Sequence, residues 1–280
     1  MKSLQFFIDM LSRNRRLHIS VLDVNGILNT EKRRLDFENI IHSKEFCRVA
    51  KSTDKGLRLC LYCKKLANTK AVTEKKAFSG HCAYGLYEAA VPVVIGGVTC
   101  AVVYVGNAIV DKEKTFLRIE KSAKGTKVDK ERLLELTKEC EYLNTPDELL
   151  GIAEIISDYI KALYAAEPKA SEDTHWLVSA LKQYADKAYL FNPTLKELSV
   201  LYHKNEKYMG RLFKAALGVS FHEYCLALKL DHAAKMLKST KEKAIDVALE
   251  CGFNNISYFN RAFKKKHGVT PNEYRKKGSV

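Results

Sequence analysis

Long apolar runs are missing from this 280-residue sequence, and their absence argues against one class of protein. Nowhere do eighteen apolar residues stand together, and the nearest stretch, AAVPVVIGGVTCAVVYVG, is interrupted by Pro92, Gly96 and Gly97. A membrane-spanning helix needs about twenty predominantly apolar residues. No apolar run follows the basic first residues either, so no secretory leader is expected. We therefore expect a soluble protein in the cytoplasm, with no membrane partner.

The common sequence motifs of enzymes are also missing. The sequence contains neither the glycine pattern of phosphate-binding loops nor that of dinucleotide-binding enzymes. Its eight histidines do not combine with acids at the H-E-x-x-H spacing of zinc proteases. We therefore expect that the protein is not an enzyme.

Acidic residues are fewer than basic ones, and the imbalance is uneven along the chain. The sequence holds 47 Lys and Arg against 33 Asp and Glu, a net charge of +14. Residues 171–280 hold 19 of the basic and 11 of the acidic residues, so this shorter part carries more than half of the net charge. Such a distribution is typical of a protein with an anionic partner such as nucleic acid. A merely solvated basic face is the alternative.

The length and composition predict two globular domains. The stretch AAEPKASEDT is polar, contains Pro168 and shows no apolar periodicity, which is typical of a boundary between domains. We therefore expect a first domain at residues 1–165, a linker at 166–174 and a second domain at 175–280.

Two turn signals predict β-hairpins in the first domain. In HISVLDVNGILN the apolar residues alternate around Asn25-Gly26, a type I′ turn signal, so we expect two strands joined by a tight turn. The stretch YEAAVPVVIGGVTCAVVYVG repeats this arrangement around Gly96-Gly97, with β-branched residues on both sides. A small antiparallel sheet with helices packed on it is an α+β fold.

The first domain is expected to end in a long helix within residues 144–166. Thr145 is expected to cap it, with Pro146 in its first turn and Glu148 completing a capping box. Apolar residues then recur at alternating spacings of three and four: Leu149, Ile152, Ile156, Tyr159 and Leu163. This stripe favours either packing on the helix's own domain or a short coiled coil in a homodimer.

The second domain contains a repeat. Tyr208–Tyr224 reads YMGRLFKAALGVSFHEY and Tyr258–Tyr274 reads YFNRAFKKKHGVTPNEY, with eight of seventeen positions identical. A single pair is too few for a solenoid, which needs about three stacked units, so the repeat indicates a duplicated module within one domain.

Each copy is predicted to be a helix-turn-helix, which is a short helix, a tight turn and a second helix. In the first copy a capping box of Thr194 and Glu197 opens the short helix, and Asn205 caps the second. In the second copy Gly252 supplies the turn and Asn255 the cap. The second helices are expected at Glu206–Leu217, closed by Gly218, and at Ile256–His267, closed by Gly268.

The apolar positions of each second helix decide which face points outward. We expect Tyr208, Met209, Leu212, Phe213 and Ala216 in the first copy and Phe259, Ala262 and Phe263 in the second to be buried. The outward positions then form the candidate DNA-binding set: Lys207, Gly210, Arg211, Lys214, Ile256, Ser257, Asn260, Arg261 and Lys264.

The chemistry of this outward set suits duplex DNA. An arginine projected from the first turns of a helix matches the O6 and N7 atoms of guanine in a major groove, and a lysine matches a phosphate. The alternative is that Arg211 and Arg261 only form ion pairs with Glu223 and Glu273.

Residues 195–276 resemble the AraC-type DNA-binding domain over its whole length. The resemblance includes the linking helix FHEYCLALKLDHAAKML and the closing signature GFNNISYFNRAFKKKHGVTPNEYR. It implies two helix-turn-helix units that bind successive major-groove segments on one side of double-stranded DNA. The base-facing positions would be Lys207, Gly210 and Arg211, then Ile256, Ser257, Asn260 and Arg261. Gly210 departs from the usual side chain, so the first unit is expected to read fewer bases.

The first domain is similar to the PocR-type sensory domain, a PAS-like module. The similarity lies in Cys47, Cys60, Cys82, Gly85, Leu86 and Pro92, which occur in the expected order. It implies a small-molecule effector, a hydrocarbon derivative such as a short diol. Ala83 stands where many relatives place a histidine, and this departure puts shared ligand chemistry in doubt.

Four of the eight cysteines, Cys47, Cys60, Cys63 and Cys82, lie within 36 residues. Without a secretory leader they are expected to be free thiols or ligands rather than disulfides. They could hold one zinc ion or an iron–sulfur cluster, line an effector pocket, or pack as plain core residues, and the spacing alone leaves all three open.

These patterns predict a PAS-like α+β sensor followed by an all-α double helix-turn-helix domain. We expect a sequence-specific transcription regulator that responds to an effector, with double-stranded DNA as partner and RNA polymerase as a candidate partner. The alternative is a DNA-alkylation repair methyltransferase, because one such family joins a four-cysteine zinc site to an AraC-type domain. In that family a C-x3-C pair precedes a C-x2-C pair, whereas here the close pair lies in the middle of the set.

Overall fold

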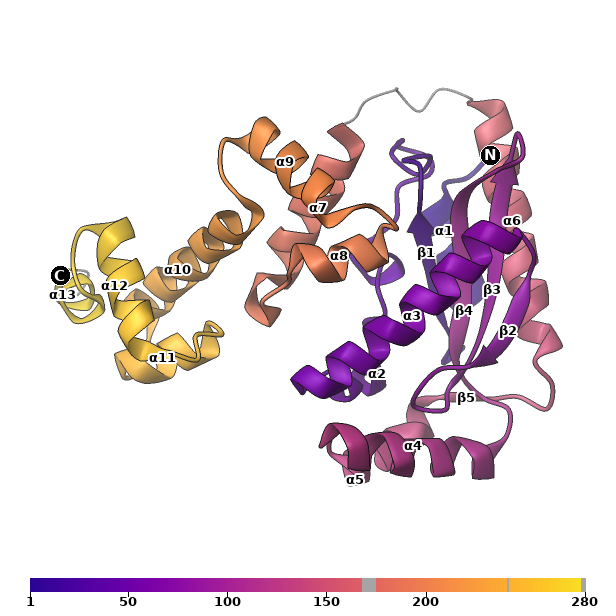
Figure 1. Cartoon of the computed structure of the whole chain (residues 1–280), viewed down its shortest axis with the longest axis horizontal. Coiled ribbons are helices and arrows are strands. Elements are labelled where there is room, and N and C mark those ends of the chain that lie inside the picture. The colour runs from indigo at the N-terminus through magenta and orange to yellow at the C-terminus, as the bar shows by residue number, and fades with distance from the viewer. Residues whose placement is uncertain (168–174, 241, 278–280) are drawn as a thin grey trace. The chain divides into compact units, whose positions relative to one another are not determined.

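The computed structural model describes residues 1–167, 175–240 and 242–277 (Figure 1). The chain divides into two compact units. The first comprises Met1–Trp176 and Val200–His203, and the second comprises Leu177–Ser199 and Lys204–Val280. Residues 168–174 of the predicted linker lie outside the described residues, so the domain limits at residues 165 and 175 stay predictions.

The first unit is built on a five-stranded sheet with the order β1-β4-β3-β2, and β5 pairs with β4. The β4–β5 pair is parallel and the other pairs are antiparallel. The strands are β1 His18–Asp23, β2 Phe78–His81, β3 Tyr87–Ile95, β4 Val98–Ile109 and β5 Glu141–Tyr142. The helices are α1 Leu4–Ser12, η1 Phe37–Asn39, α2 Glu45–Ala50, α3 Asp54–Glu74, α4 Lys112–Thr126, α5 Lys130–Leu136, η2 Thr137–Glu139 and α6 Asp147–Ala166.

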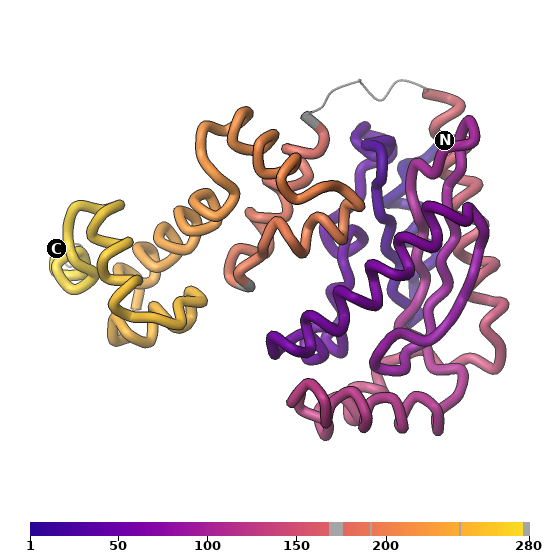
Figure 2. Tube along the Cα trace, viewed as in Figure 1, coloured from indigo at the N-terminus to yellow at the C-terminus, as the bar shows by residue number. Residues whose placement is uncertain are grey.

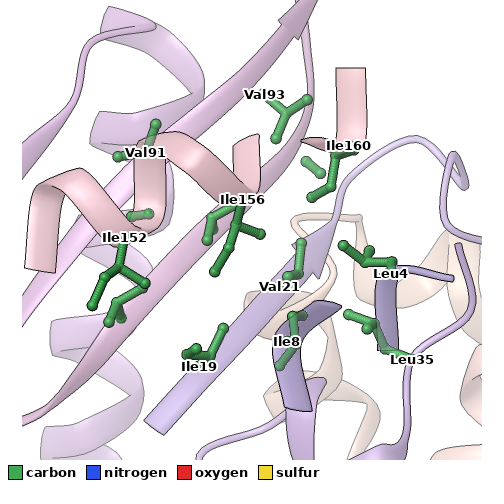
Figure 3. Packing of buried hydrophobic residues seen from close by; sticks show 14 of the residues in the cluster. Leu4, Ile8, Ile19, Val21, Leu35, Val91, Val93, Ile152, Ile156 and Ile160 are labelled. Atoms are coloured by element: carbon green, nitrogen blue, oxygen red, sulfur yellow. The ribbon is translucent and has the colours of Figure 1, made fainter. Parts of the chain in front are cut away.

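Successive side chains on the central strands point to opposite faces of the sheet. Each face is covered by helices, so the sheet contributes to two separate cores. Val91 of β3 belongs to the core that the sheet shares with α1 and α6 (Figure 3). Its neighbour Ala90 belongs to a separate core on the other face, with Tyr104 of β4 and Ala71 of α3. The predicted α+β fold with an antiparallel sheet is therefore confirmed.

The hairpin predicted at Gly96-Gly97 is confirmed. Ile95 pairs with Val98 across it, and the two glycines have φ values of +56° and +76°. Positive φ at both central residues is what a type I′ turn requires, and glycine adopts it without steric strain.

The hairpin predicted at Asn25-Gly26 is wrong, because only its first half is a strand. The carboxylate of Asp23 accepts hydrogen bonds from the backbone N–H groups of Gly26, Ile27 and Leu28, at 2.7, 3.1 and 3.1 Å. These bonds hold the next residues in a compact turn. β1 pairs instead with β4, a strand about eighty residues further along the chain.

The predicted long helix is confirmed, but its predicted cap is wrong. α6 begins at Asp147 with Pro146 at the N-cap, and no side chain there accepts a hydrogen bond from the first turn. Glu148 forms an ion pair with Arg15 at 2.8 Å instead of completing a capping box. The ion pair with the distant Arg15 therefore replaces the local capping contact of Glu148.

The apolar stripe of α6 packs on its own unit. Leu149, Ile152, Ile156 and Leu163 are buried in the core shared with the sheet. Tyr159 is half-buried, stacks on Phe7 with 4.2 Å between the ring centroids, and donates a hydrogen bond to the carbonyl of Lys2. The stripe is therefore not available for a coiled coil, and the prediction of a homodimer has no support from it.

The second unit is helical in its described part, as predicted. Figure 2 shows how the long α10 connects the first helix pair to the second. The elements are α7 His175–Ala188, η3 Tyr189–Phe191, α8 Leu195–Leu201, α9 Glu206–Leu217, α10 Phe221–Ser239, α11 Ala244–Glu250, α12 Ile256–His267 and α13 Pro271–Lys277. α9 and α12, the second helices of the two predicted modules, begin and end at the predicted residues.

The buried faces of α9 and α12 follow the predictions with two exceptions. Met209, Phe213, Phe259 and Phe263 are fully buried, while Leu212 and Ala262 are half-buried. The prediction was wrong for Ala216, which is exposed, and for Tyr208, whose exposed fraction is 41%. Both lie at the edge of the apolar stripe, where neighbouring elements, and not the helix period, decide burial.

Candidate nucleic-acid interface and ligand pocket

The first candidate recognition helix, α9, is oriented by bonds that its own neighbourhood provides. Before it, Thr194 and Glu197 cap α8 reciprocally, at 3.2 Å and 2.9 Å. The side chain of Asn205 accepts a hydrogen bond from the backbone of Tyr208 at 3.1 Å, and Gly218 ends the helix with φ +76°. These contacts fix where α9 starts and stops.

The outward face of α9 carries three exposed basic residues of the candidate set, Lys207, Arg211 and Lys214. Gly210 is half-buried, and a Cβ atom at this position would lie 3.2 Å from Leu195 of α8. A larger side chain there would crowd the first helix of the module. Gly210 therefore has a packing role in addition to its predicted place in the interface.

The second candidate recognition helix, α12, repeats this arrangement. Asn255 accepts a hydrogen bond from the backbone of Tyr258 at 2.9 Å, and Gly268 ends the helix with φ +78°. The candidate residues Ser257, Asn260, Arg261 and Lys264 are exposed, whereas Ile256 is half-buried against the core of the unit.

Arg211 and Arg261 occupy matching positions in the two helices, and both are available for a partner. In the part of the chain that the structure describes, neither forms an ion pair. Glu223 bonds to Ser220 at 2.8 Å and Glu273 to Thr270 at 2.8 Å, so both acids cap helices instead. The alternative in which these acids neutralise the arginines is therefore wrong.

Two residues of the basic C-terminal stretch have internal partners. Lys266 forms an ion pair with Asp231 at 2.7 Å and donates to the carbonyl of Ala227 at 2.7 Å. Arg275 donates to the carbonyl of Leu237 at 3.3 Å. These two side chains tie α12 and α13 to α10, so part of the local excess of positive charge serves packing.

The first unit contains a cavity of about 120 Å³ between α2, α3 and the sheet. All four clustered cysteines, Cys47, Cys60, Cys63 and Cys82, line it. Pockets that hold drug-sized ligands are typically about 300 Å³ or larger, so this cavity fits a molecule of only a few heavy atoms. The rest of its wall is largely aromatic and small apolar: Phe46, Ala50, Ala67, Phe78, Ala83, Tyr84, Ala90 and Tyr104.

The four cavity thiols are half-buried, and three of them have raised pKa values. Burial raises the pKa of Cys47 to about 12, and it raises the pKa values of Cys60 and Cys82 as well. Protonated thiols are weak nucleophiles and weak metal ligands. In the described residues, no three His, Cys, Asp or Glu side chains are arranged to hold a metal ion. This geometry favours the thiol-lined pocket among the three alternatives, and metal binding stays a prediction.

One end of the cavity is strongly polar. Glu88 of β3 contacts the ring Nε2 of His42 at 2.8 Å and Lys64 of α3 at 3.6 Å. The Lys64 ammonium lies 3.2 Å from the same ring nitrogen and 3.0 Å from the ring centroid of Tyr104. Three segments of the chain thus meet around one half-buried carboxylate.

The electrostatics of this polar end are those of a balanced ion pair. Burial alone would raise the pKa of Glu88, but Lys64 and His42 outweigh it and lower the pKa to about 2. Burial lowers the pKa of His42, and the nearby Lys64 lowers it further. Glu88 is therefore charged at neutral pH while His42 is neutral, and burial lowers the pKa of Lys64 while Glu88 opposes that shift.

Sequence reasoning missed His42, Lys64, Glu88 and Tyr104. None of them belongs to a recognisable motif, and 46 residues separate the first from Glu88. The sequence offered one signal for Lys64. It directly follows Cys63, which was already a candidate residue for the pocket. Only the sheet and α3 together bring the four side chains to one place.

Comparison with known proteins agrees with these two units. A family model described as the sensory domain found in PocR matches residues 1–165, and a helix-turn-helix domain model matches residues 198–277. No helix in the described part of the chain has the length and apolar character needed to cross a membrane.

Curated relatives match over part of their length. The chain is 28% identical over 127 residues to the uncharacterized HTH-type transcriptional regulator YijO of Escherichia coli, which is 45% of this chain and 44% of that protein. It is 31% identical over 109 residues to the uncharacterized HTH-type transcriptional regulator YisR of Bacillus subtilis, 39% of this chain and 37% of that protein. The bifunctional transcriptional activator/DNA repair enzyme AdaA of Bacillus subtilis is 34% identical over 103 residues, 37% and 48% of the two chains. The chain thus spans less than half the length of these relatives.

Solved structures match over about a third of the chain. The C-terminal domain of AraT, a response regulator from Geobacillus stearothermophilus, is 30% identical, with 37% of this chain and 87% of that chain covered and a TM-score of 0.36. A probable AraC family transcriptional regulator from Rhodopseudomonas palustris is 23% identical, with 37% and 98% covered and a TM-score of 0.35. Since the PocR-type model spans more than half of the sequence and the helix-turn-helix model follows it, the chain belongs to the family of AraC-type regulators with an N-terminal PocR sensory domain.

Proposed function

We propose that the protein is a sequence-specific transcription regulator whose two recognition helices bind adjacent major-groove segments of double-stranded DNA. The observation that carries the proposal is the matched pair of Arg211 and Arg261. Each arginine is exposed on a helix whose opposite face is buried, through Met209 and Phe213 in α9 and through Phe259 and Phe263 in α12. Neither arginine has an ion-pair partner in the described part of the chain. A guanidinium without an ion-pair partner, on the outward face of a helix, can donate to both guanine acceptors at once.

The lysines of the same faces have a different proposed role. Lys207, Lys214 and Lys264 are exposed on the faces that carry the arginines. An ammonium group acts as a point charge, which suits phosphates and adds affinity without sequence preference. Ser257, Asn260 and Ile256 complete the second face, where a hydroxyl, an amide and an apolar side chain can contact base edges.

The first test separates base contacts from phosphate contacts. Duplexes that the full chain binds would be selected from random DNA, and affinities for selected and random duplexes compared. Arg211→Ala and Arg261→Ala should cost about 1–3 kcal/mol on the selected DNA and relax its base preference. Lys264→Ala should weaken all duplexes alike, and Lys121→Ala, an exposed lysine of α4, is the control for lost charge. Equal losses on selected and random DNA for both arginine variants would exclude the base-reading role.

The second test addresses the two-site geometry. Two units that bind successive grooves on one side of the duplex require half-sites about 10 base pairs apart. An insertion of about five base pairs between the half-sites turns one of them to the opposite side. Unchanged affinity after this insertion would contradict simultaneous binding by both units.

For the sensor unit we propose that the cavity is the effector site and that the effector is uncharged. The cavity wall carries one cation, Lys64, and one anion, Glu88, so its charges are balanced. A charged molecule would leave one buried charge without compensation, which is expensive in an interior of low polarity. A small hydroxyl-bearing hydrocarbon derivative, the class that the PocR resemblance implies, meets both the size and the charge requirement.

The alternative of a DNA-alkylation repair methyltransferase has less support. A cysteine that accepts a methyl group reacts as a thiolate. Burial raises the pKa of Cys47 to about 12 and also raises the pKa values of Cys60 and Cys82, so these three thiols are poor acceptors. A methyltransfer assay on alkylated DNA separates the two functions, and transfer of the methyl group to a cavity cysteine would overturn the regulator proposal for the sensor unit.

The remaining parts of the proposal are cellular. A regulator of this kind acts in the cytoplasm, where the DNA that it binds lies, and has RNA polymerase as a candidate partner. A homodimer would need a surface other than the α6 stripe, because that stripe is buried on its own sheet.

A further inference from the structure

A buried lysine lies at the centre of the second unit. Lys229, in the middle of α10, has an exposed fraction of 4%. Its ammonium donates one hydrogen bond to the side-chain oxygen of Asn192 and another to the backbone carbonyl of Gly252, at 3.0 Å. In the described residues no carboxylate pairs with it, and burial lowers the pKa of Lys229.

The two acceptors belong to different modules. Asn192 closes the short helix η3 with φ +53° and leads into α8, the first helix of the first helix-turn-helix. Gly252 forms the turn between α11 and α12, the two helices of the second one. Asn192 also donates directly to the carbonyl of Gly252 at 3.2 Å. Three segments of the chain therefore meet at one ammonium group. The two outer ones, at Asn192 and Gly252, lie about 60 residues apart in the sequence.

The junction leaves no free volume at the turn. Gly252 has φ +74°, and a Cβ atom there would lie 2.6 Å from the carbonyl oxygen of Leu190 and 2.9 Å from the nitrogen of Lys229. The backbone of the turn is thus pressed against both the η3 segment and the lysine. Such close approach requires glycine and restricts movement of the turn relative to η3.

A lysine is a poor choice if the only requirement is stability. Burying an ammonium group without an anion is unfavourable, and an apolar side chain of similar length would fill the space without that penalty. What the lysine adds is direction, because its charge-assisted bonds hold two specific acceptors at fixed positions. In some proteins, buried polar groups of this kind select one arrangement among several that would pack equally well.

We propose that Lys229 is a positioning residue that locks the turn of the second helix-turn-helix to the segment leading into the first. The lock makes α9 and α12 engage DNA as one body with a defined separation. This inference rests on the proposed two-site binding to DNA. It extends that proposal because it assigns the coupling between the sites to a residue that touches no DNA.

The test compares coupled with single-site binding by the full chain. Three kinds of duplex are used: the selected operator, the same operator with one half-site scrambled, and operators with one base pair added or removed between the half-sites. Lys229→Met should keep the affinity for the single half-site but lose about ten- to a hundredfold of the gain that the second half-site provides, since that gain depends on geometry. It should also tolerate the altered spacing that the unmodified protein rejects.

Three further variants make the outcome specific. Lys229→Arg keeps a buried cation that can reach both acceptors, so it should retain most of the coupling. Asn192→Gly removes one acceptor while permitting the same positive φ, and should show a smaller loss of coupling than Lys229→Met. Lys235→Met makes the same change at an exposed position of α10 and should leave both affinities unchanged.

The possible results separate the inference from the proposal on which it rests. If the unmodified protein binds the whole and the half operator equally, two-site binding itself is wrong. If it prefers the whole operator and both Lys229→Met and Asn192→Gly keep the full preference and spacing dependence, the positioning role is wrong. Equal losses of affinity on whole and half operators would show that Lys229 is needed only for folding, and thermal melting of each variant checks this outcome. If Lys229→Met is unfolded, the result for Asn192→Gly decides.

Discussion

The ion pair between Lys64 and Glu88 should make a measurable contribution to the stability of the sensor unit. Their side chains are 16% and 19% exposed, so the pair is shielded from solvent. Lys64 and His42 together lower the pKa of Glu88 from 4.5 to about 2, while burial lowers the pKa of Lys64 and opposes part of this gain. A shift of this size corresponds to about 3 kcal/mol in favour of the folded state when the carboxylate is charged.

Single substitutions should break the pair asymmetrically. At pH 7, Glu88→Gln removes the anion, leaves Lys64 buried without compensation, and should lower the free energy of unfolding by about 3 kcal/mol. Lys64→Met leaves the carboxylate uncompensated and should cost about 3–5 kcal/mol. The double variant has no buried charge at either position, so it should lose clearly less than the sum of the two single losses.

The assay is urea unfolding of the full chain at pH 7, followed by hydrogen exchange of peptides from β3 and β4 so that the sensor unit is observed. Glu154→Gln, an exposed glutamate of α6, is the control and should change stability by less than about 0.5 kcal/mol. Because the pKa of Glu88 is lowered, its contribution is present above pH 4.5 and is lost as the pH falls toward 2. Additive single losses, or the same acid sensitivity in the Glu88→Gln variant, would refute the electrostatic account.

Three further predictions concern other parts of the chain. Burial raises the pKa of Asp23 from 3.8 to about 6, so stability should fall as the pH rises through this interval, and pH-dependent melting should show no such fall in Asp23→Asn. Anaerobically purified protein should carry no stoichiometric zinc or iron by elemental analysis, and one zinc or one cluster per chain that disappears in a Cys60→Ser/Cys63→Ser variant would support the metal alternative. Gly252→Ala should lower the melting temperature because of its positive φ and crowded Cβ, whereas Gly125→Ala, on open helix surface, should raise stability by about 0.5–1 kcal/mol; similar effects at both positions would contradict the strain argument.

Much of the helix-turn-helix region could be predicted because its signals are local. The caps Asn205 and Asn255 bond to backbone groups three residues away, and Gly218 and Gly268 end their helices at the next residue. Such bonds need nothing from the rest of the chain, so the helix limits followed from the sequence. Burial at the edge of a helix stripe does depend on the neighbours, and for this reason the prediction failed at Tyr208.

The sequence by itself determined the two-domain organisation, the duplicated helix-turn-helix and the presence of clustered thiols, because these depend on composition, repetition and short spacings. Only the tertiary structure decided which distant groups meet. Three contacts are of this kind: the pairing of β1 with β4, the ion pair of Lys64 and Glu88, and the junction at Lys229. Each connects segments that lie more than twenty residues apart. Contacts at that range are selected by the packing of whole elements, and no local pattern of residues encodes them.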